Sequence, residues 1–347
     1  MVHLIKRGGT LLGNMRRLRP AYVGVLLLII AATGFFVIRS AELIVTFRPL
    51  PYAIDNRWNW SIPARSEDIW FTAADGVKLN GWFVHSRRDT VAATILYCHG
   101  NSGNLTHVRD HAQKLAEQGY DVLVFDYRCY GRSSCKLPDE RGINSDAAAA
   151  YEYLTRQRRI SPERLVVYGW SLGTTAAIDL AARRPCGALI VEAGLSSAGA
   201  MAKVKLPWLP HWLYWVGRNQ FASLQKIAQV KCPIFVSHGT NDEIIPVEQG
   251  QQLFAAARSP KELVLIPGRT HWVAKGEDQA YFHKLSAFIS DSLERTLAVR
   301  EVDVCAAPPT NNPAILDDRQ EAPPWSMPIL SIAPGVAVFQ FPRGQHY

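Results

Sequence analysis

Short apolar runs alternate with amphipathic segments along most of the chain. Residues 66–85 alternate apolar and polar positions and break at Asp75-Gly76, which predicts two strands joined by a tight turn. Later apolar runs are typical of buried parallel strands. They lie at residues 94–100, 120–128, 164–169, 187–193, 232–239 and 261–268.

Segments with helical spacing lie between or after these runs. They cover residues 107–119, 145–157, 171–185, 247–259 and 278–297. Ser145 is placed to cap the second of them. Strands that alternate with helices predict an α/β fold, in which a mostly parallel central sheet carries helices on both faces.

The N-terminal part predicts a membrane anchor. Residues 21–38 contain no charge, which is the short end of the length that a single transmembrane helix needs. A cleaved signal peptide and a buried helix are the alternatives. Five Lys/Arg precede the segment and three follow it within a similar distance, so the basic leader, residues 1–20, is expected in the cytoplasm. A connector, residues 39–65, then leads to the main domain on the other side of the membrane.

Composition narrows the function classes. The chain is 48% hydrophobic and 20% charged, which is typical of a globular protein. The net charge of +8 is partly concentrated in the leader, and no basic stripe with interleaved aromatics indicates a nucleic-acid partner. No metal site and no cofactor is expected, because the sequence lacks zinc-ligand spacing, a P-loop and a dinucleotide fingerprint. Cys129 and Cys135 could pair in an oxidising compartment, but their spacing does not decide it.

Residues 169–173, Gly-Trp-Ser-Leu-Gly, stand between a predicted strand and a predicted helix. This context is typical of a nucleophile elbow, a sharp turn that presents a reactive serine at a helix N-terminus. Ser171 is therefore the candidate nucleophile. A glycine-rich turn without a catalytic role is the alternative.

A serine nucleophile needs a histidine base, and the base needs a carboxylate. Asp242 and His271 follow two later strands in the order that this fold requires. Because the carboxyl ends of parallel strands share one edge of a sheet, the three side chains should converge. Asp278 and Glu243 are weaker candidates for the acid. His283 and His238 are rival histidines, of which His238 is expected to support the acid loop.

Two backbone N–H groups are expected to stabilise the oxyanion that forms during attack. One belongs to Leu172, directly after the nucleophile. The other belongs to Asn101, in the loop that follows the strand at residues 94–100. His99 in the same loop is expected to make a structural hydrogen bond.

Six motifs between residues 66 and 295 resemble those of the α/β-hydrolase family. They are CHGNSGN, FDYRCYGRSS, YGWSLG, IVEAGLSS, VKCPIFVSHGTNDEIIP and PGRTHW. The sequence is most similar to a membrane-anchored branch, related to serine-aminopeptidase-like and acyl-protein-thioesterase-like members. The resemblance implies an α/β-hydrolase domain at residues 66–298 that cleaves esters, thioesters or amides through an acyl-enzyme. Two positions depart from the family pattern: Cys129 usually is Gly, and Ala222 often is Asp.

Residues 195–230 interrupt the alternation where this fold often carries a lid. Trp208 and Trp212 there, with Trp170 and Trp272 beside the nucleophile and base, are candidates for a substrate pocket. Packing within a short lid is the alternative. The expected substrate is an acyl ester or thioester, and the expected membrane contact is made by residues 21–38. A serine peptidase or a catalytically inactive, membrane-tethered binding module remains possible. The Pro-rich segment 299–347 is predicted to be a tail.

Overall fold

The structure is a computed structural model that describes residues 20–49, 62–208, 210, 217–258, 260–273, 278–306, 330–333 and 336–338. The chain forms two compact units, Met1–Val302 and Asp303–Tyr347. In the second unit, β11 (Leu330–Ala333) and β12 (Val336–Val338) form a small antiparallel pair. Most of the predicted leader and tail, and residues 50–61 of the connector, lie outside the described residues.

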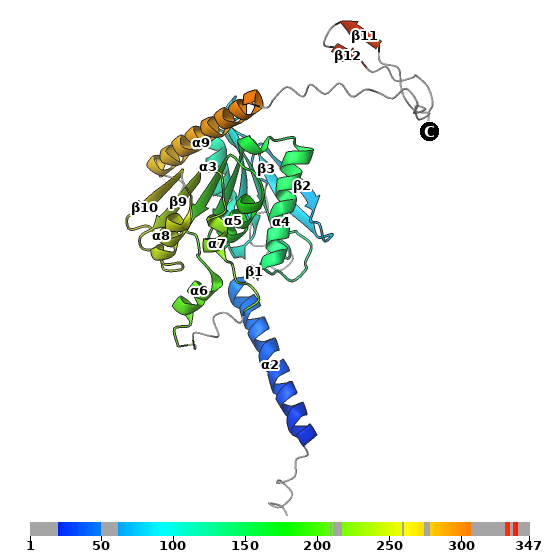
Figure 1. The fold of residues 1–347 in the computed structure, drawn as a ribbon, viewed down its shortest axis with the longest axis vertical. Coiled ribbons are helices and arrows are strands. Elements are labelled where there is room, and N and C mark those ends of the chain that lie inside the picture. Colours follow the sequence, from blue (N-terminus) through cyan, green and yellow to red (C-terminus); the bar gives the residue numbers. More distant parts are fainter. Residues whose placement is uncertain are drawn as a thin grey trace, which may run out of the picture. The chain divides into compact units, whose positions relative to one another are not determined.

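An eight-stranded sheet forms the centre of the first unit, in the order β10-β9-β8-β7-β4-β6-β3-β2 (Figure 1). The antiparallel strands are β2 (Ser66–Thr72) and β3 (Lys78–Val84), and β3 also pairs antiparallel with β6. The parallel strands are β4 (Ala93–Cys98), β6 (Tyr120–Phe125), β7 (Leu165–Trp170), β8 (Ala188–Glu192), β9 (Ile234–Gly239) and β10 (Lys261–Ile266). The prediction of a mostly parallel sheet with an antiparallel hairpin at one edge is confirmed.

Helices cover both faces of this sheet because alternate strand residues point to opposite sides. Ile95 and Tyr97 belong to an apolar cluster that contains α3 (Leu105–Glu117) and α9 (Gln279–Ala306). Leu96 and Cys98 belong to a second cluster on the opposite face. That cluster contains α4 (Glu140–Glu152), α5 (Gly173–Arg183), α7 (Ser223–Ile227) and α8 (Val247–Ala256).

The largest departures from the predicted helix boundaries are at the start of α4 and the end of α9. Helix α4 begins at Glu140, and the side chain of Asp139 caps it by accepting a hydrogen bond from Gly142 N–H. Ser145 is therefore not the cap but lies inside the helix. The helix ends in a π-helical turn, Tyr153–Gln157, and a 3₁₀ turn, Pro162–Arg164, precedes β7. Helix α9 continues to Ala306, eight residues beyond the predicted domain boundary at 298.

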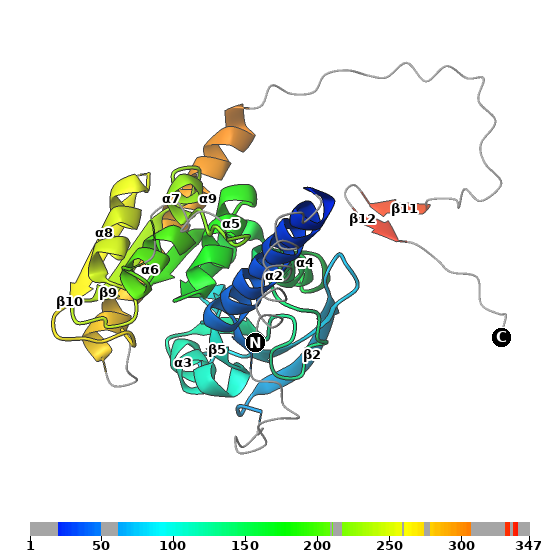
Figure 2. The same cartoon turned by 90° about the horizontal axis from the view of Figure 1, so that it is seen from below.

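The predicted anchor belongs to α2 (Pro20–Thr46), which leads into β1 (Arg48–Pro49) (Figures 1 and 2). β1 pairs with β5 (Ser102–Gly103) in a separate two-stranded parallel sheet. Phe47 is buried there and packs edge-on against Phe221, with ring centroids 6.2 Å apart. Within the described residues, no helix combines the length and the hydropathy that a membrane span requires. The anchor at residues 21–38 stays a prediction.

Candidate active site

Ser171 occupies a sharp turn between β7 and α5. Its φ of +55° lies in the left-handed region, which is costly for any residue except glycine. Gly173 makes this turn possible, because a Cβ atom there would lie 2.0 Å from the carbonyl oxygen of Cys98. The N–H of Ser171 donates to the carbonyl of Glu192 at 3.0 Å, which ties the turn to the end of β8.

The structure brings Ser171, His271 and Asp242 together. His271 Nε2 lies 2.8 Å from Ser171 Oγ, and His271 Nδ1 lies 2.8 Å from Asp242 Oδ2. Asp242 follows β9 and His271 follows β10, while Ser171 follows β7, which β8 separates from β9. All three residues therefore leave the carboxyl ends of parallel strands at one edge of the sheet. This arrangement is the one that a serine nucleophile, its base and an orienting carboxylate require. The catalytic roles of these residues stay predictions.

The carboxylate of Asp242 is held by four partners. Oδ1 accepts hydrogen bonds from the N–H groups of Ile244 and Ile245, at 2.8 and 2.9 Å. Oδ2 lies 3.2 Å from His238 Nε2 as well as beside His271. Burial raises the pKa of Asp242, but the hydrogen bonds from His238, His271 and Ile245 outweigh it and leave this pKa well below its usual range. Asp242 therefore stays charged and can orient His271.

Three of the rival candidates, Asp278, Glu243 and His283, do not contact this group. Asp278 forms an ion pair with Arg269, and Glu243 is exposed. His283 is exposed on α9. His238 supports the acid loop, because its Nε2 also bonds the carbonyl of Ile245 at 2.9 Å.

The loop after β4 lies against the nucleophile. A Cβ atom at Gly100 would lie 2.9 Å from the Trp170 ring and 3.4 Å from Ser171 Cβ. The Gly100 carbonyl accepts from His99 Nδ1 at 2.8 Å. Because the peptide unit is planar and trans, this contact also fixes the direction of the Asn101 N–H. Burial lowers the pKa of His99 to about 4, so this ring is neutral at physiological pH.

The two predicted oxyanion donors, Asn101 and Leu172, thus belong to two segments: Asn101 follows Gly100, whose Cβ position would contact Ser171, and Leu172 follows Ser171 itself. Leu172 directly follows Ser171 at the N-terminus of α5, where the first N–H groups of a helix have no intrahelical acceptor. The carbonyl of Asn101 is occupied by the N–H of Arg48 and by Tyr130 Oη, both at 2.9 Å. That the N–H groups of Asn101 and Leu172 stabilise an oxyanion stays a prediction.

The predicted pocket tryptophans fall into three groups. Trp170 stacks on Trp272 with ring centroids 3.9 Å apart, and its indole N–H donates to the carbonyl of His271 at 3.3 Å. Trp208 follows α6 (Ala198–Lys205) and is 75% exposed. Trp212 lies outside the described residues. The sequence did not predict the hydrogen bond from the Trp170 indole to the carbonyl of His271, although Trp170 directly precedes the nucleophile.

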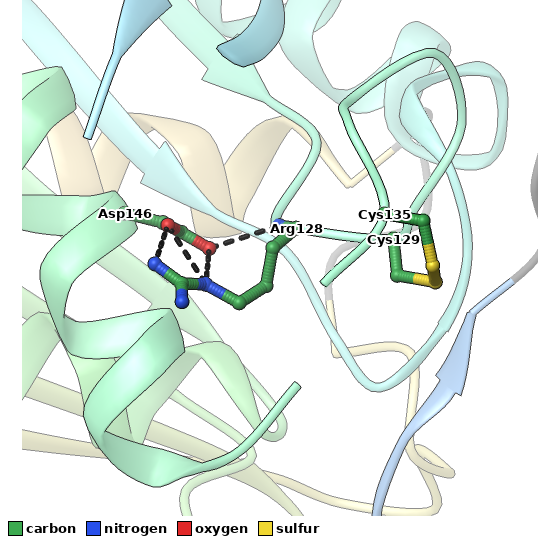
Figure 3. Close-up of a disulfide and its surroundings, with 4 residues drawn as sticks. All are labelled: Arg128, Cys129, Cys135 and Asp146. Carbon is green, nitrogen blue, oxygen red and sulfur yellow. Dashed lines mark hydrogen bonds and ion pairs between the residues drawn. A yellow bond between two sulfur atoms is a disulfide. The ribbon is translucent and has the colours of Figure 1, made fainter. Parts of the chain in front are cut away.

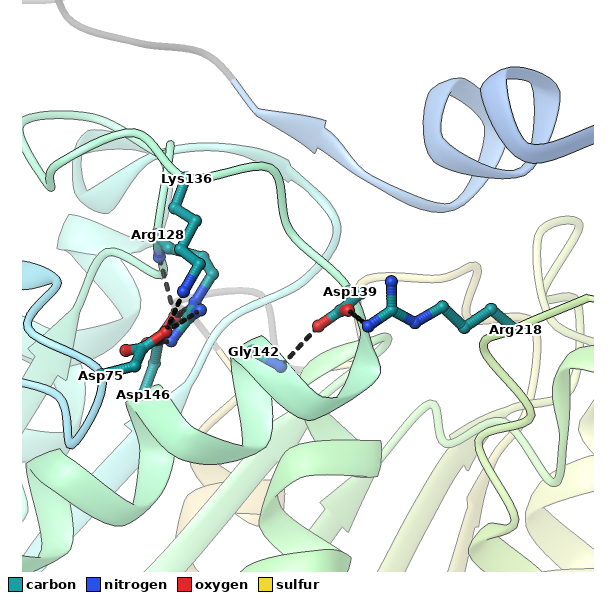
Figure 4. Close-up of polar contacts among 7 residues, drawn as sticks. All are labelled: Asp75, Arg128, Lys136, Asp139, Gly142, Asp146 and Arg218. Carbon is teal, nitrogen blue, oxygen red and sulfur yellow. Dashed lines mark hydrogen bonds and ion pairs between the residues drawn. The ribbon is translucent and has the colours of Figure 1, made fainter. Parts of the chain in front are cut away.

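A large polar cavity of about 960 Å³ lies between α4, α5 and α7, and its walls do not include the three catalytic candidates. Charged pairs line it: Arg218 contacts Asp139 at 2.6 Å (Figure 4), and Lys226 contacts Glu140 and Asp179 at 2.9 and 2.8 Å. Such a lining does not suit an apolar acyl chain. Among the described residues, no group of three or more His, Cys, Asp or Glu is arranged to hold a metal ion.

Comparison with known proteins identifies the relatives of this chain. The profile of the Prolyl oligopeptidase family matches residues 106–296, more than half of the chain. A protein of Mycobacterium tuberculosis is 35% identical over 211 residues, covering 61% of this chain and 74% of the relative. The α/β hydrolase domain-containing protein WAV2 of Arabidopsis thaliana is 34% identical over 234 residues, covering 61% and 75%.

Solved esterase structures resemble the fold. An esterase of Pyrococcus furiosus has a TM-score of 0.54 at 23% identity, covering 72% of this chain and 98% of the esterase. Est1E of Butyrivibrio proteoclasticus, solved with ferulic acid bound, has a TM-score of 0.52 at 19% identity, covering 66% and 99%. At this level of identity, the likeness establishes the fold alone.

Proposed function

Since the chain belongs to the Prolyl oligopeptidase family, whose relatives here include α/β-hydrolase domain proteins, we propose that it is a serine hydrolase that cleaves acyl esters or thioesters. One observation carries this proposal. The hydrogen-bonded chain from Ser171 through His271 to Asp242 ends in a carboxylate that stays charged. That chain can take a proton from Ser171 during attack and return it to the leaving group.

In this proposal, each step of acyl transfer is assigned to a residue of the site. His271 Nε2 accepts the proton from Ser171 Oγ, and Asp242 stabilises the resulting imidazolium. The N–H groups of Asn101 and Leu172 stabilise the oxyanion of the tetrahedral intermediate. His271 then protonates the leaving group, and it activates water to hydrolyse the acyl-enzyme.

A peptidase is the second candidate, and the matching family profile favours it. The same three residues cleave amides. A catalytically inactive binding module is the alternative from another class, and an intact triad argues against it.

We also propose that residues 21–38 hold the protein at a lipid bilayer, with the N-terminus in the cytoplasm. Described apolar side chains along α2 support this contact, because Leu28 and Phe36 are each 71% exposed. The disulfide Cys129–Cys135 supports a non-cytoplasmic domain, because disulfides persist in oxidising compartments. Membrane fractionation of the full chain, beside a Leu28→Arg/Phe36→Arg variant, tests it. Alkali-resistant retention of the wild type alone is expected, and equal release of both would refute the anchor.

The first experiment on activity uses a fluorophosphonate probe, which reacts with activated serines. Wild type should be labelled and Ser171→Ala should not. Hydrolysis of p-nitrophenyl esters of increasing chain length, acyl thioesters and proline p-nitroanilide then separates esterase, thioesterase and peptidase activity. A folded wild type that resists the probe and cleaves none of these substrates would refute the hydrolase and favour the binding module.

A further inference from the structure

The carbonyls of residues 99 to 101, in the loop that carries the predicted oxyanion donor, are each occupied by a hydrogen-bond donor. Tyr127 Oη donates to the carbonyl of His99 at 3.3 Å, and His99 Nδ1 donates to that of Gly100. The carbonyl of Asn101 accepts from Tyr130 Oη and also from the N–H of Arg48, both at 2.9 Å. Asn101 thus stands between two fixed peptide planes. The Asn101 N–H lies in the Gly100–Asn101 plane. Rotation of the next plane, which carries the Asn101 carbonyl, changes ψ of Asn101 and so shifts the loop that carries this N–H.

Tyr130 reaches Asn101 from a loop that a disulfide closes. Cys129 and Cys135 bracket this loop, and Tyr130 directly follows Cys129 (Figure 3). The Tyr130 side chain is fully buried, and its ring packs edge-on against His99 with centroids 5.4 Å apart. The hydroxyl therefore has one well-defined position, at the carbonyl of Asn101.

The disulfide holds a conformation that its own cysteine does not favour. Cys129 has a φ of +67°, which suits glycine. The N–H of Cys129 donates to the carbonyl of Ser134 at 3.1 Å. The covalent link to Cys135 opposes the relaxation of Cys129 toward negative φ, which would move Tyr130.

Ion pairs also hold the residues on either side of this disulfide-closed loop. Arg128, before Cys129, bonds the buried carboxylate of Asp146 on α4 at 2.7 Å and Asp75 at 2.8 Å (Figures 3 and 4). Lys136, after Cys135, reaches the same oxygen of Asp75 at 2.7 Å. Both ends of the loop are thus attached to Asp75, in the turn between β2 and β3. A reductant leaves these ion pairs in place and breaks only the disulfide. Cys135 is exposed and accessible to such a reagent.

We propose that Tyr130 is a positioning residue for the oxyanion hole, and that the Cys129–Cys135 disulfide makes its hold sensitive to redox state. This inference rests on the proposed serine hydrolase function. Reduction breaks the S–S bond, takes up two electrons and two protons, and leaves two thiols. A trialkylphosphine supplies the electrons and ends as its oxide, with oxygen from water.

The test compares Tyr130→Phe with Tyr151→Phe in the full-length protein. Tyr151 is also buried and also donates to a carbonyl, that of Pro185, so it loses the same kind of bond elsewhere. Loss of an oxyanion donor costs about 10²–10³-fold in kcat, and a donor that is only misdirected should cost roughly tenfold. Tyr130→Phe should lower kcat on a p-nitrophenyl ester roughly tenfold with KM within about twofold, while Tyr151→Phe keeps both. The affinity of an alkyl boronic acid, whose adduct on Ser171 is tetrahedral, should fall in parallel with kcat.

The redox part is tested with the phosphine. Treated wild type should lose kcat in the same direction, whereas Cys129→Gly/Cys135→Ser should be insensitive and more active than Cys129→Ala/Cys135→Ser, because glycine tolerates the positive φ. Unchanged kcat in Tyr130→Phe would overturn the positioning role. Unchanged kcat in reduced wild type would overturn the redox coupling. A wild type that neither reacts with the fluorophosphonate nor cleaves esters would overturn the proposed function, and this inference with it.

Discussion

Replacing Asp242 by asparagine isolates the charge of the carboxylate from its shape. In the wild type, Oδ1 accepts two backbone N–H groups, from Ile244 and Ile245. An asparagine must keep its carbonyl oxygen there, because an NH₂ group would face two donors. Its Nδ2 then takes the place of Oδ2, 2.8 Å from His271 Nδ1.

This exchange reverses the tautomer of the base. The amide donates to His271 Nδ1, so the ring proton moves to Nε2, which faces Ser171 Oγ at 2.8 Å. A protonated Nε2 donates to the serine and cannot accept its proton. Loss of the correct tautomer costs about 10³–10⁴-fold in kcat, or about 4–5 kcal/mol of transition-state stabilisation.

The assay is kcat on a p-nitrophenyl ester together with the rate of fluorophosphonate labelling. Both should fall by about the same factor, while KM and the unfolding midpoint stay near the wild-type values. Asp291→Asn, an exposed change on α9, is the matched control and should retain full activity. An Asp242→Asn enzyme within tenfold of the wild type would refute the assignment of Asp242 as the orienting acid.

Three further predictions concern the turn, the oxyanion loop and the hairpin. Ser171→Gly should abolish labelling but stabilise the domain by about 1 kcal/mol relative to Ser171→Ala in urea unfolding, because glycine adopts φ near +55° without strain; equal stability would contradict the strain. Gly100→Ala should lower kcat at least tenfold, since its Cβ would press on the Trp170 ring, and activity equal to the wild type would show that this loop yields freely. Hydrogen bonds from Arg128 and then Lys136 hold the pKa of Asp75 well below its usual range. Its stabilisation is therefore present above pH 4 and is lost as pH falls below that value. Asp75→Asn should cost about 1 kcal/mol in unfolding free energy at pH 7, because this carboxylate is a third exposed, and the difference should shrink steadily as pH falls below 4; a difference as large at pH 2 as at pH 7 would contradict this origin.

The sequence predicted the sheet and the meeting of Ser171, Asp242 and His271 because both follow from strand periodicity and from the common edge of parallel strands. The sequence prediction placed the start of α4 too late, at Ser145 instead of Glu140. The alanine-rich run has a clearer helical pattern than the residues directly after Asp139, which is the observed N-cap. The sequence could not predict the bond from Trp170 to His271, or that from Tyr130 to Asn101. These contacts join residues 101 and 29 positions apart, and their partners are backbone carbonyls, which carry no sequence signal. The pairing of Cys129 with Cys135 depended in the same way on a left-handed φ that spacing does not reveal.

The separation of Ser171 and His271 by 100 residues has a consequence for biosynthesis. At translation rates of about 5–20 residues per second, the ribosome needs roughly 5–20 s to pass from the nucleophile to its base. Throughout that interval the nascent chain carries a serine without a partner to activate it, and β9 and β10 are still missing from one side of the sheet. On the proposed mechanism, hydrolytic activity arises only after the last strand of this sheet has docked.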